Sequence, residues 1–545
     1  MSQAPLHAEA AGAGSPDTAV PSVQAKRGWR TPVGVAILVA TVIGLALRLL
    51  QLTRPGHLLG VTEYDDGVYF GSAIRLINGV MPYKDFTLVQ PPGLIVLMTP
   101  IAALSKVTGS AWGMGIARLI TACAGAASVP LAGLLVRRRG LLAVIITCGI
   151  MAVFPDAILA AHTALQEPWL VLFCLIGLLA VFEDDRLTGN SSRLAWGGVA
   201  LGFAGAVKLW AIFPIVVIAV LCLPSMRRVG TYLGGVAVGF LVPVLPFLVA
   251  APSMFWRGVF LAQLVRVDNA RTSWATRLAD LSGLGATVNP KVGVATATTA
   301  LVIVLIALLV AGACVAASVV THRLPPPLEW FALVTSLLVF ISFLVPADFY
   351  YHYAAFFTPF LALAVGLPVA RLVAGLQQRS GQRSPGLRPE AAAAGLAVLV
   401  LLVMTIVQGH SEAVLKPATD PTSAPATIPP GACVLTDQVS FTIAADRFTS
   451  SAPGCPQLVD GDGTDLALSE GHNGVSGAAH NPAVRAIWDS AFQKAQYVWL
   501  SNTFFDKTVA RRIAWTHALR LYFGDNFQLV PGPTKNLYKR IDRSG

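Results

Sequence analysis

Residues 111–139 have the sequence AWGMGIARLITACAGAASVPLAGLLVRRR, a long apolar run that ends in three consecutive arginines. An apolar run of about 20 residues is long enough to cross a bilayer as a helix. Arginines beside such a run favour the cytoplasmic side of the membrane. We therefore predict a membrane-spanning helix over 111–136 that runs from outside to inside and leaves Arg137, Arg138 and Arg139 in the cytoplasm.

Similar apolar runs recur along the chain. Hydrophobic residues make up 55% of its 545 residues and charged residues only 12%, whereas soluble domains carry about 25% charged residues. This composition indicates a polytopic α-helical membrane protein and argues against a cytosolic enzyme, a nucleic-acid binder or a disordered scaffold. With 111–136, the runs give eleven predicted membrane spans, and the other ten are 33–50, 140–154, 168–182, 194–207, 209–224, 230–250, 294–320, 328–346, 352–373 and 390–407.

The basic residues orient these spans. The net charge of +11 arises largely from Lys and Arg that lie between apolar runs, where they set topology. Lys26, Arg27 and Arg30 precede the first span, so we expect a cytoplasmic N-terminus in the plasma membrane. An odd number of spans then leaves the C-terminal part outside.

The composition divides the chain into four parts. Residues 1–31 form a predicted disordered cytoplasmic tail, and residues 32–407 form the transmembrane domain, with a first outside loop at 51–110. A linker at 408–430 leads to residues 431–545, where short strand-like runs alternate with helix-like stretches. We predict that this last part is a small extracytoplasmic α/β domain.

Two cysteines, Cys433 and Cys455, lie in the C-terminal part. A cysteine pair in an exported domain predicts a disulfide. The alternative is two free thiols in a cytosolic tail. The same part contains Asp460-Gly-Asp462-Gly-Thr-Asp465, which fails the spacing of an EF-hand calcium loop and is better interpreted as a polar turn.

The richest polar segment of the first outside loop is Glu63-Tyr64-Asp65-Asp66-Gly67. Adjacent carboxylates repel each other, and partial burial raises the pKa of a carboxyl. Such a group suits a general base for an acceptor hydroxyl, or a ligand for a divalent cation such as Mg²⁺, Mn²⁺ or Ca²⁺. The alternative is a solvated acidic turn. Asp65 and Asp66 are thus candidate catalytic residues, and the candidate metal ligands if a metal binds, with Glu63 as a further acid beside them.

After this motif come a helical stretch at 68–77, Asn78-Gly79, a segment led by Pro82, and Gln90-Pro-Pro-Gly93 before an apolar helix. This order resembles the first outside loop of membrane glycosyltransferases of the GT-C fold, in particular the protein O-mannosyltransferases and the lipid A aminoarabinose transferases. The pair Asp65-Asp66 corresponds to their acidic motif, with Asp where many relatives have Glu. The resemblance covers roughly residues 30–375.

The resemblance implies a polyprenyl-phosphate sugar donor and sugar transfer on the outer face of the membrane. Asp65 would take the proton of the acceptor hydroxyl, and Asp66 would position the acceptor or a metal ion. The Ala-rich, Lys-poor composition suggests an actinobacterial source, for which mannose or arabinose is the expected sugar. The acceptor would be an envelope glycan, a glycolipid or a protein, and membrane lipids would surround the spans.

A lipid-phosphate donor requires cations near the outer membrane face, because positive charge stabilises the departing phosphate. Lys208 lies in a predicted outside turn, where it either contacts phosphate or extends to the interface as a helix-end lysine. Four basic residues of longer outside loops are further candidates for donor-phosphate binding: Arg75, Lys84, Arg266 and Arg271. The segment with Arg266 and Arg271 is better interpreted as an interfacial helix, and donor binding by these two arginines is the alternative.

Two shorter outside loops also carry polar residues. Glu167 is a candidate second acidic group of the site, or a carboxylate that the dipole favours at a helix start. Tyr351 and His352 lie in an aromatic-rich segment that suits a wall for the acceptor or sugar, or an interfacial belt.

Two other functional classes fit the composition. A transporter or flippase of lipid-linked sugars would need polar binding groups within the membrane, whereas the ionisable residues here concentrate in loops. A non-catalytic protein that binds lipid-linked sugars is the second alternative.

Overall fold

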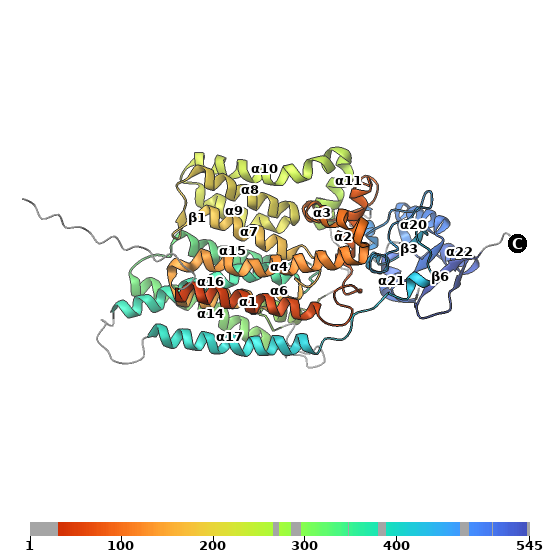
Figure 1. Cartoon of the computed structure of the whole chain (residues 1–545). Coiled ribbons are helices and arrows are strands. Elements are labelled where there is room, and N and C mark those ends of the chain that lie inside the picture. Colours follow the sequence, from red (N-terminus) through yellow and green to blue (C-terminus); the bar gives the residue numbers. More distant parts are fainter. Residues whose placement is uncertain are drawn as a thin grey trace, which may run out of the picture.

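The computed structural model describes residues 31–264, 272–284, 296–346, 348–379, 389–468, 479–503 and 505–541. Long helices lie side by side in a bundle, and a smaller part built of helices and short strands covers one end of it (Figure 1).

Seven helices of the described residues are long and apolar enough to cross a membrane. They are α1 (Pro32–Leu52), α4 (Ser110–Val136), α10 (Met226–Ala250), α14 (Thr296–Thr321), α15 (Pro327–Leu344), α16 (Tyr353–Arg379) and α17 (Pro389–Ala413). Shorter helices occupy the other predicted spans: α5 (Leu141–Val153), α7 (Glu167–Val181), α8 (Ser191–Val207) and α9 (Ile212–Cys222). The chain is a multi-pass membrane protein, and the count of eleven spans stays a prediction.

The outer surfaces of the bundle are apolar. On α17, Leu399, Leu402 and Ile406 are each more than half exposed, which is unfavourable in water and suits contact with lipid. Inside the bundle, small residues allow close backbone contact. A Cβ on Gly202 of α8 would lie 2.1 Å from the carbonyl oxygen of Val236 on α10, so these two helices pack backbone against backbone.

Further helices and turns connect the long helices of the bundle. They include α2 (Asp65–Ile77), α3 (Gly93–Thr108), α6 (Pro155–Leu159), α11 (Pro252–Trp256), the π-helical turn η3 (Arg257–Leu261), α12 (Ala262–Leu264) and α13 (Trp274–Leu281). The 3-10 turn η2 (Leu209–Ala211) connects α8 to α9, and η4 (Ala424–Ala426) lies in the segment that leads to the C-terminal part.

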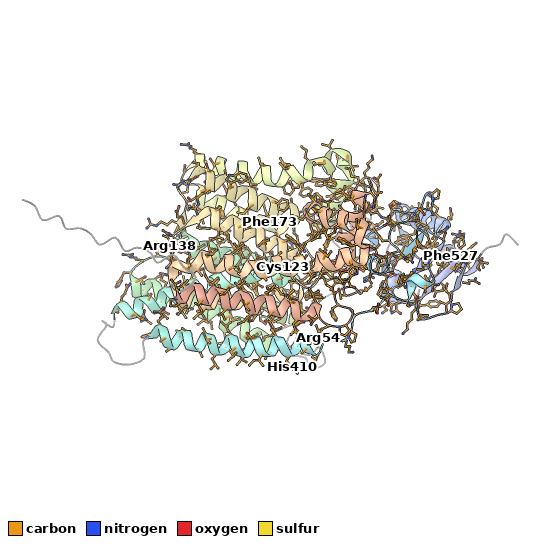
Figure 2. All side chains as sticks on the ribbon, viewed as in Figure 1. Arg54, Cys123, Arg138, Phe173, His410 and Phe527 are labelled. Atoms are coloured by element: carbon orange, nitrogen blue, oxygen red, sulfur yellow. A yellow bond between two sulfur atoms is a disulfide. The ribbon has the colours of Figure 1, made fainter. Side chains whose placement is uncertain are left out.

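The opposite end of the bundle carries the arginine triplet, which forms the 3-10 turn η1 (Arg137–Arg139). A hairpin of β1 (Phe182–Glu183) and β2 (Arg186–Leu187) lies beside it, and Arg139 pairs with Asp185 at 2.6 Å. Arg138, which pairs with Asp184, is labelled at this end in Figure 2, far from Phe527 of the C-terminal part.

The C-terminal part contains a four-stranded sheet with the order β3 (Val434–Thr436), β4 (Tyr497–Trp499), β6 (Leu537–Arg540), β5 (Phe527–Leu529). The pair β3–β4 is parallel, and the other pairs are antiparallel. Its helices are α18 (Val439–Ala444), α19 (Gly461–Leu468), α20 (Pro482–Lys494), α21 (Lys507–Arg512) and α22 (His517–Asn526). Trp488, Phe492 and Phe523 are buried in its core, and Cys433 forms a disulfide with Cys455 across 5.6 Å between Cα atoms.

The C-terminal part is docked directly on the bundle. Helix α18 lies so close to α2 that a Cβ on Gly67 would be 2.6 Å from the backbone nitrogen of Ser440. Asp446 accepts hydrogen bonds from the backbone N–H of Ala111 at 2.9 Å and from the Ser110 hydroxyl at 3.0 Å. Since the first N–H groups of a helix have no partner within it, Asp446 caps α4 from outside the bundle.

The disulfide predicts a stability effect confined to the C-terminal part. Cys433→Ser opens a loop closed across 22 residues, and the loss of a crosslink of this span lowers the free energy of unfolding by about 3 kcal/mol. Thermal unfolding in detergent, followed by proteolysis within residues 431–541, measures it. Cys123→Ser, which removes an exposed free thiol, is the control, and equal melting of the two variants would contradict the prediction.

Candidate functional site

A cavity of about 160 Å³ lies where the start of α2, the turn after α8, the segment before α16 and the start of α19 meet. Its walls combine acids, cations and aromatic rings from distant parts of the sequence. The polar lining residues are Glu63, Tyr64, Asp65, Tyr69, Gln90, Lys208, Tyr350, Tyr351, His352, Tyr353, Asp460, Asp462 and Arg512.

Asp65 is the first residue of α2 and lines this cavity. A carboxylate in the first turn of a helix is favoured by the positive end of the helix dipole. The position therefore presents a carboxylate to the cavity from a rigid element.

Glu63 lies beside Asp65 in a different environment. Burial, and then the charge of Asp65, raise the pKa of Glu63. The Tyr351 hydroxyl donates to Glu63 Oε2 at 3.1 Å, and the backbone N–H of Tyr64 donates to Oε1 at 3.0 Å. Two neighbouring acids in unlike surroundings can hold different protonation states, and here Glu63 holds its proton more readily than an exposed glutamate.

Asp66 does not line the cavity. It is fully buried, and Arg118 of α4 binds its Oδ2 through Nη2 at 2.6 Å and Nε at 3.0 Å. The Ser440 hydroxyl donates to Oδ1 at 3.2 Å. The structure thus corrects the prediction that Asp66 positions an acceptor or a metal ion, because both of its oxygens are occupied by groups that hold α2 in place.

Lys208, Glu167 and His352 form one cluster. Glu167 Oε1 accepts from the Lys208 ammonium group and lies 2.8 Å from His352 Nδ1. The Lys208 ammonium group also lies over the rings of Trp210 at 3.8 Å and Tyr353 at 4.7 Å. Lys208 and His352 line the cavity, whereas Glu167 lies behind them and holds both.

The structure separates other predicted residues from the cavity. The Arg75 guanidinium lies 4.2 Å from the centre of the Phe448 ring, so this arginine packs against the C-terminal part. Lys84 is exposed and is not part of the lining. Arg266 and Arg271 lie outside the described residues.

The C-terminal part supplies a wall that the sequence does not predict. The Tyr64 hydroxyl donates to Asp460 Oδ1 at 2.9 Å, and Arg512 lies 3.9 Å from the centre of the Tyr64 ring. Arg512 also pairs with Asp462 at 3.4 Å. Asp460 and Asp462 lie at the start of α19, where the sequence predicts a polar turn and the structure instead has a helix. No local pattern in the sequence connects these aspartates to Tyr64.

The described residues contain no cluster of three or more His, Cys, Asp or Glu side chains arranged to hold a metal ion. Asp66 is committed to Arg118, which leaves Asp65 and Glu63 as the carboxyls of the acidic motif that face the cavity. A divalent cation at Asp65 stays a hypothesis.

The buried pair predicts that the two adjacent aspartates differ in their effect on stability. Asp66→Asn leaves the Arg118 charge buried without its partner, and such a loss costs about 3–5 kcal/mol. Asp65→Asn, the neighbouring control, removes a partly exposed carboxyl and leaves the pair intact. Unfolding midpoints of both variants in the same detergent test this, and equal midpoints would contradict the assignment.

The burial of Asp460 predicts a pH dependence of stability. Burial raises the pKa of Asp460 to about 7. Because the folded-state pKa lies above the unfolded value, the stability from neutral Asp460 is present at low pH and is lost as pH rises through about 7. Hydrogen exchange of α19 should therefore be faster at pH 8 than at pH 6, at matched intrinsic exchange rates, and Asp460→Asn should reduce that difference. An unchanged difference in the variant would assign it to other groups.

Comparison with known proteins agrees with this architecture. Residues 90–230 match the family model of dolichyl-phosphate-mannose-protein mannosyltransferases, and no curated protein matches the chain in sequence. ArnT from Cupriavidus metallidurans, crystallised with undecaprenyl phosphate, superimposes with a TM-score of 0.54 at 13% identity, over 94% of this chain and 98% of that chain. The archaeal oligosaccharyltransferase AglB from Archaeoglobus fulgidus, in complex with an inhibitory peptide and a dolichol-phosphate, superimposes with a TM-score of 0.52 at 14% identity, over 94% of this chain and 74% of that chain. The chain therefore has the GT-C fold of these membrane glycosyltransferases.

Proposed function

We propose that this chain is a membrane glycosyltransferase that moves a sugar from a polyprenyl-phosphate donor to a hydroxyl acceptor at the extracytoplasmic face. The observation that carries the proposal is the cavity, which places the Asp65 carboxylate and the cationic wall of Lys208 around one enclosed space. The two similar structures were solved with undecaprenyl phosphate and with a dolichol-phosphate, which supports a lipid-phosphate donor.

In the proposed reaction, Asp65 accepts the proton of the acceptor hydroxyl. The acceptor oxygen attacks the anomeric carbon and forms the new glycosidic bond. The bond from this carbon to the donor phosphate oxygen breaks, and its electron pair leaves with the phosphate. Attack from the face opposite the leaving phosphate inverts the configuration at the anomeric carbon.

Lys208 is the proposed stabiliser of the leaving phosphate. Fixed positive charge near a developing anion lowers the barrier most when the site excludes water. The ammonium group is held by Glu167 and two aromatic rings, so its position is set before the donor binds. His352 shares the Glu167 carboxylate and is the proposed neighbouring polar contact for sugar or phosphate.

The orientation of the bundle supports reaction outside the cytoplasm. Arg138 of the arginine triplet lies at the end of the bundle away from the C-terminal part (Figure 2), whereas the cavity is lined by the start of α2 and by residues of the C-terminal part. If the triplet is cytoplasmic, as basic residues beside spans generally are, the cavity and residues 431–545 are extracytoplasmic. This arrangement also agrees with eleven spans and a cytoplasmic N-terminus in the plasma membrane.

Mannose and arabinose are the proposed sugars, and an envelope glycan, glycolipid or protein is the proposed acceptor. The C-terminal part contributes Asp462 and Arg512 to the cavity wall. A separate wall that is not part of the membrane bundle is suited to acceptor selection, because it can change without disturbing the donor site.

A transporter is the alternative from another functional class. Transporters hold their substrates near the bilayer midplane, commonly at broken helices. This polar cavity instead lies where the start of α2 meets α19 of the C-terminal part. Its position favours surface chemistry.

Asp65→Asn should abolish most transfer and retain donor binding. Removing a general base lowers the rate by about 10²- to 10⁴-fold, whereas the Lys208 cluster is untouched. The measurement is transfer from radiolabelled polyprenyl-phosphate mannose and arabinose to extracted envelope acceptors, with polyprenyl-phosphate binding measured on the same purified protein.

Asp85→Asn is the control, because Asp85 is an exposed acid of the same loop. Undiminished transfer by Asp65→Asn would remove this residue as the base. Donor binding without transfer in the wild type, with every acceptor fraction, would favour a lipid-sugar binding protein, and uptake of the lipid into the opposite leaflet would favour a flippase.

A further inference from the structure

Arg48 is a fully buried arginine near the C-terminal end of α1. Its guanidinium donates to the carbonyl oxygens of Gly44 at 2.9 Å, Met151 at 3.2 Å and Ala152 at 3.4 Å. The last two belong to the final turn of α5, whose carbonyls have no partner within the helix. In the part of the chain that the structure describes, no carboxylate pairs with Arg48, and its Nε has no hydrogen-bond partner.

Glu167 also has a buried polar atom without a hydrogen-bond partner. Its Oε1 serves both Lys208 and His352, whereas its Oε2 is buried without a hydrogen-bond partner. A buried carboxylate oxygen that is left unsatisfied is costly. The carboxylate that fixes the wall of the proposed donor site is therefore only half satisfied by protein groups.

The two residues that carry these unpaired atoms line the same small cavity. It has a volume of about 20 Å³ and is lined by Arg48, Ser128, Glu167 and Thr358, among others. A single water molecule needs about 10–15 Å³ and two to four polar partners. The hydroxyls of Ser128 and Thr358 donate to carbonyls of their own helices, so their oxygens can still accept.

We propose that this cavity binds one water molecule that accepts from Arg48 Nε and donates to Glu167 Oε2, which makes Arg48 a positioning residue for Lys208 and His352. The water satisfies both unpaired atoms and turns Glu167 Oε1 toward the two cavity-wall groups. Arg48 acts only through Glu167, on the side away from the proposed donor. The effect on transfer rests on the proposed function, whereas the water site does not.

If Arg48 served only as a cap on α5, filling the cavity would leave sugar transfer unchanged. Gly125 of α4 separates the two roles, because a Cβ there would lie 3.0 Å from Arg48 Nε and 3.0 Å from Ala161 Cβ. Gly125→Ala thus fills the cavity without removing a charge or a capping hydrogen bond. Gly115→Ala is the matched control on the same helix, because its Cβ would meet the Leu59 side chain at 2.9 Å and does not enter this cavity.

Radiolytic labelling tests the water site directly. Bound water exposed to an X-ray beam produces hydroxyl radicals that oxidise adjacent side chains, and Met151 lines the cavity although it is only 2% exposed. Met151 should be oxidised in the wild type and in Gly115→Ala, and should lose most of this labelling in Gly125→Ala. Met98, which is equally buried and outside this cavity, should stay unlabelled. An unlabelled Met151 in the wild type would overturn the water site.

The positioning role is tested on the same proteins. Misplacement of catalytic groups by a fraction of an ångström to 1 Å lowers rates by up to about 100-fold. Gly125→Ala and Arg48→Gln should lower kcat for sugar transfer by about 10- to 100-fold and weaken polyprenyl-phosphate binding, with Arg48→Lys partly restoring both. Gly115→Ala should behave as the wild type.

Loss of Met151 labelling in Gly125→Ala with unchanged kcat and binding would overturn the positioning role. If Gly125→Ala does not fold, Ser128→Val, which fills the same cavity from another wall, replaces it. If the wild type transfers no sugar, Met151 labelling and polyprenyl-phosphate binding still decide the proposal, so its failure is distinct from failure of the transferase assignment.

Discussion

The buried ion pair between Asp66 and Arg118 fixes the geometry on which the site depends. Both side chains are fully buried, and transferring two charges out of water is expensive unless their hydrogen bonds are satisfied. Arg118 meets that condition, because it also donates to the carbonyl oxygens of Leu58 and Gly60 at 2.8 Å each. One guanidinium therefore joins α4, the segment before the acidic motif, and the first turn of α2.

This pair explains how two adjacent aspartates acquire different roles. Successive side chains on an α-helix diverge by about 100°, since each turn contains 3.6 residues. When Asp66 faces Arg118 and Ser440, Asp65 must face elsewhere, and it lines the cavity. Arg118 neutralises the charge of Asp66 and fixes the first turn of α2. Asp65 lies in the same turn, so its position at the cavity is fixed as well.

The sequence predicts the helices because apolar run length is a local property, and each predicted span coincides with a helix. The sequence also indicates Asp65, Lys208 and His352 as candidate site residues, and all three line the cavity. It does not predict that Glu167 holds the last two, because their pairing depends on how α7, α8 and α16 pack. Arg118 carried a local signal, since an ionisable residue within an apolar run requires a partner. The contact of Tyr64 with Asp460 joins residues 396 positions apart, which no local pattern can show.

The proposed transfer reaction gives a chemical reason for the firm attachment of the C-terminal part. A lipid-phosphate sugar is an activated donor, and water competes with the acceptor hydroxyl for its anomeric carbon. Tyr64, Asp460 and Arg512 close the cavity on the side away from the bundle, and the Asp446 cap on α4 holds that wall from a second point. A flexibly tethered domain would admit water whenever it moved away. Docking through buried contacts would keep this wall in place during the proposed transfer, and Asp462 and Arg512 of the wall line the cavity.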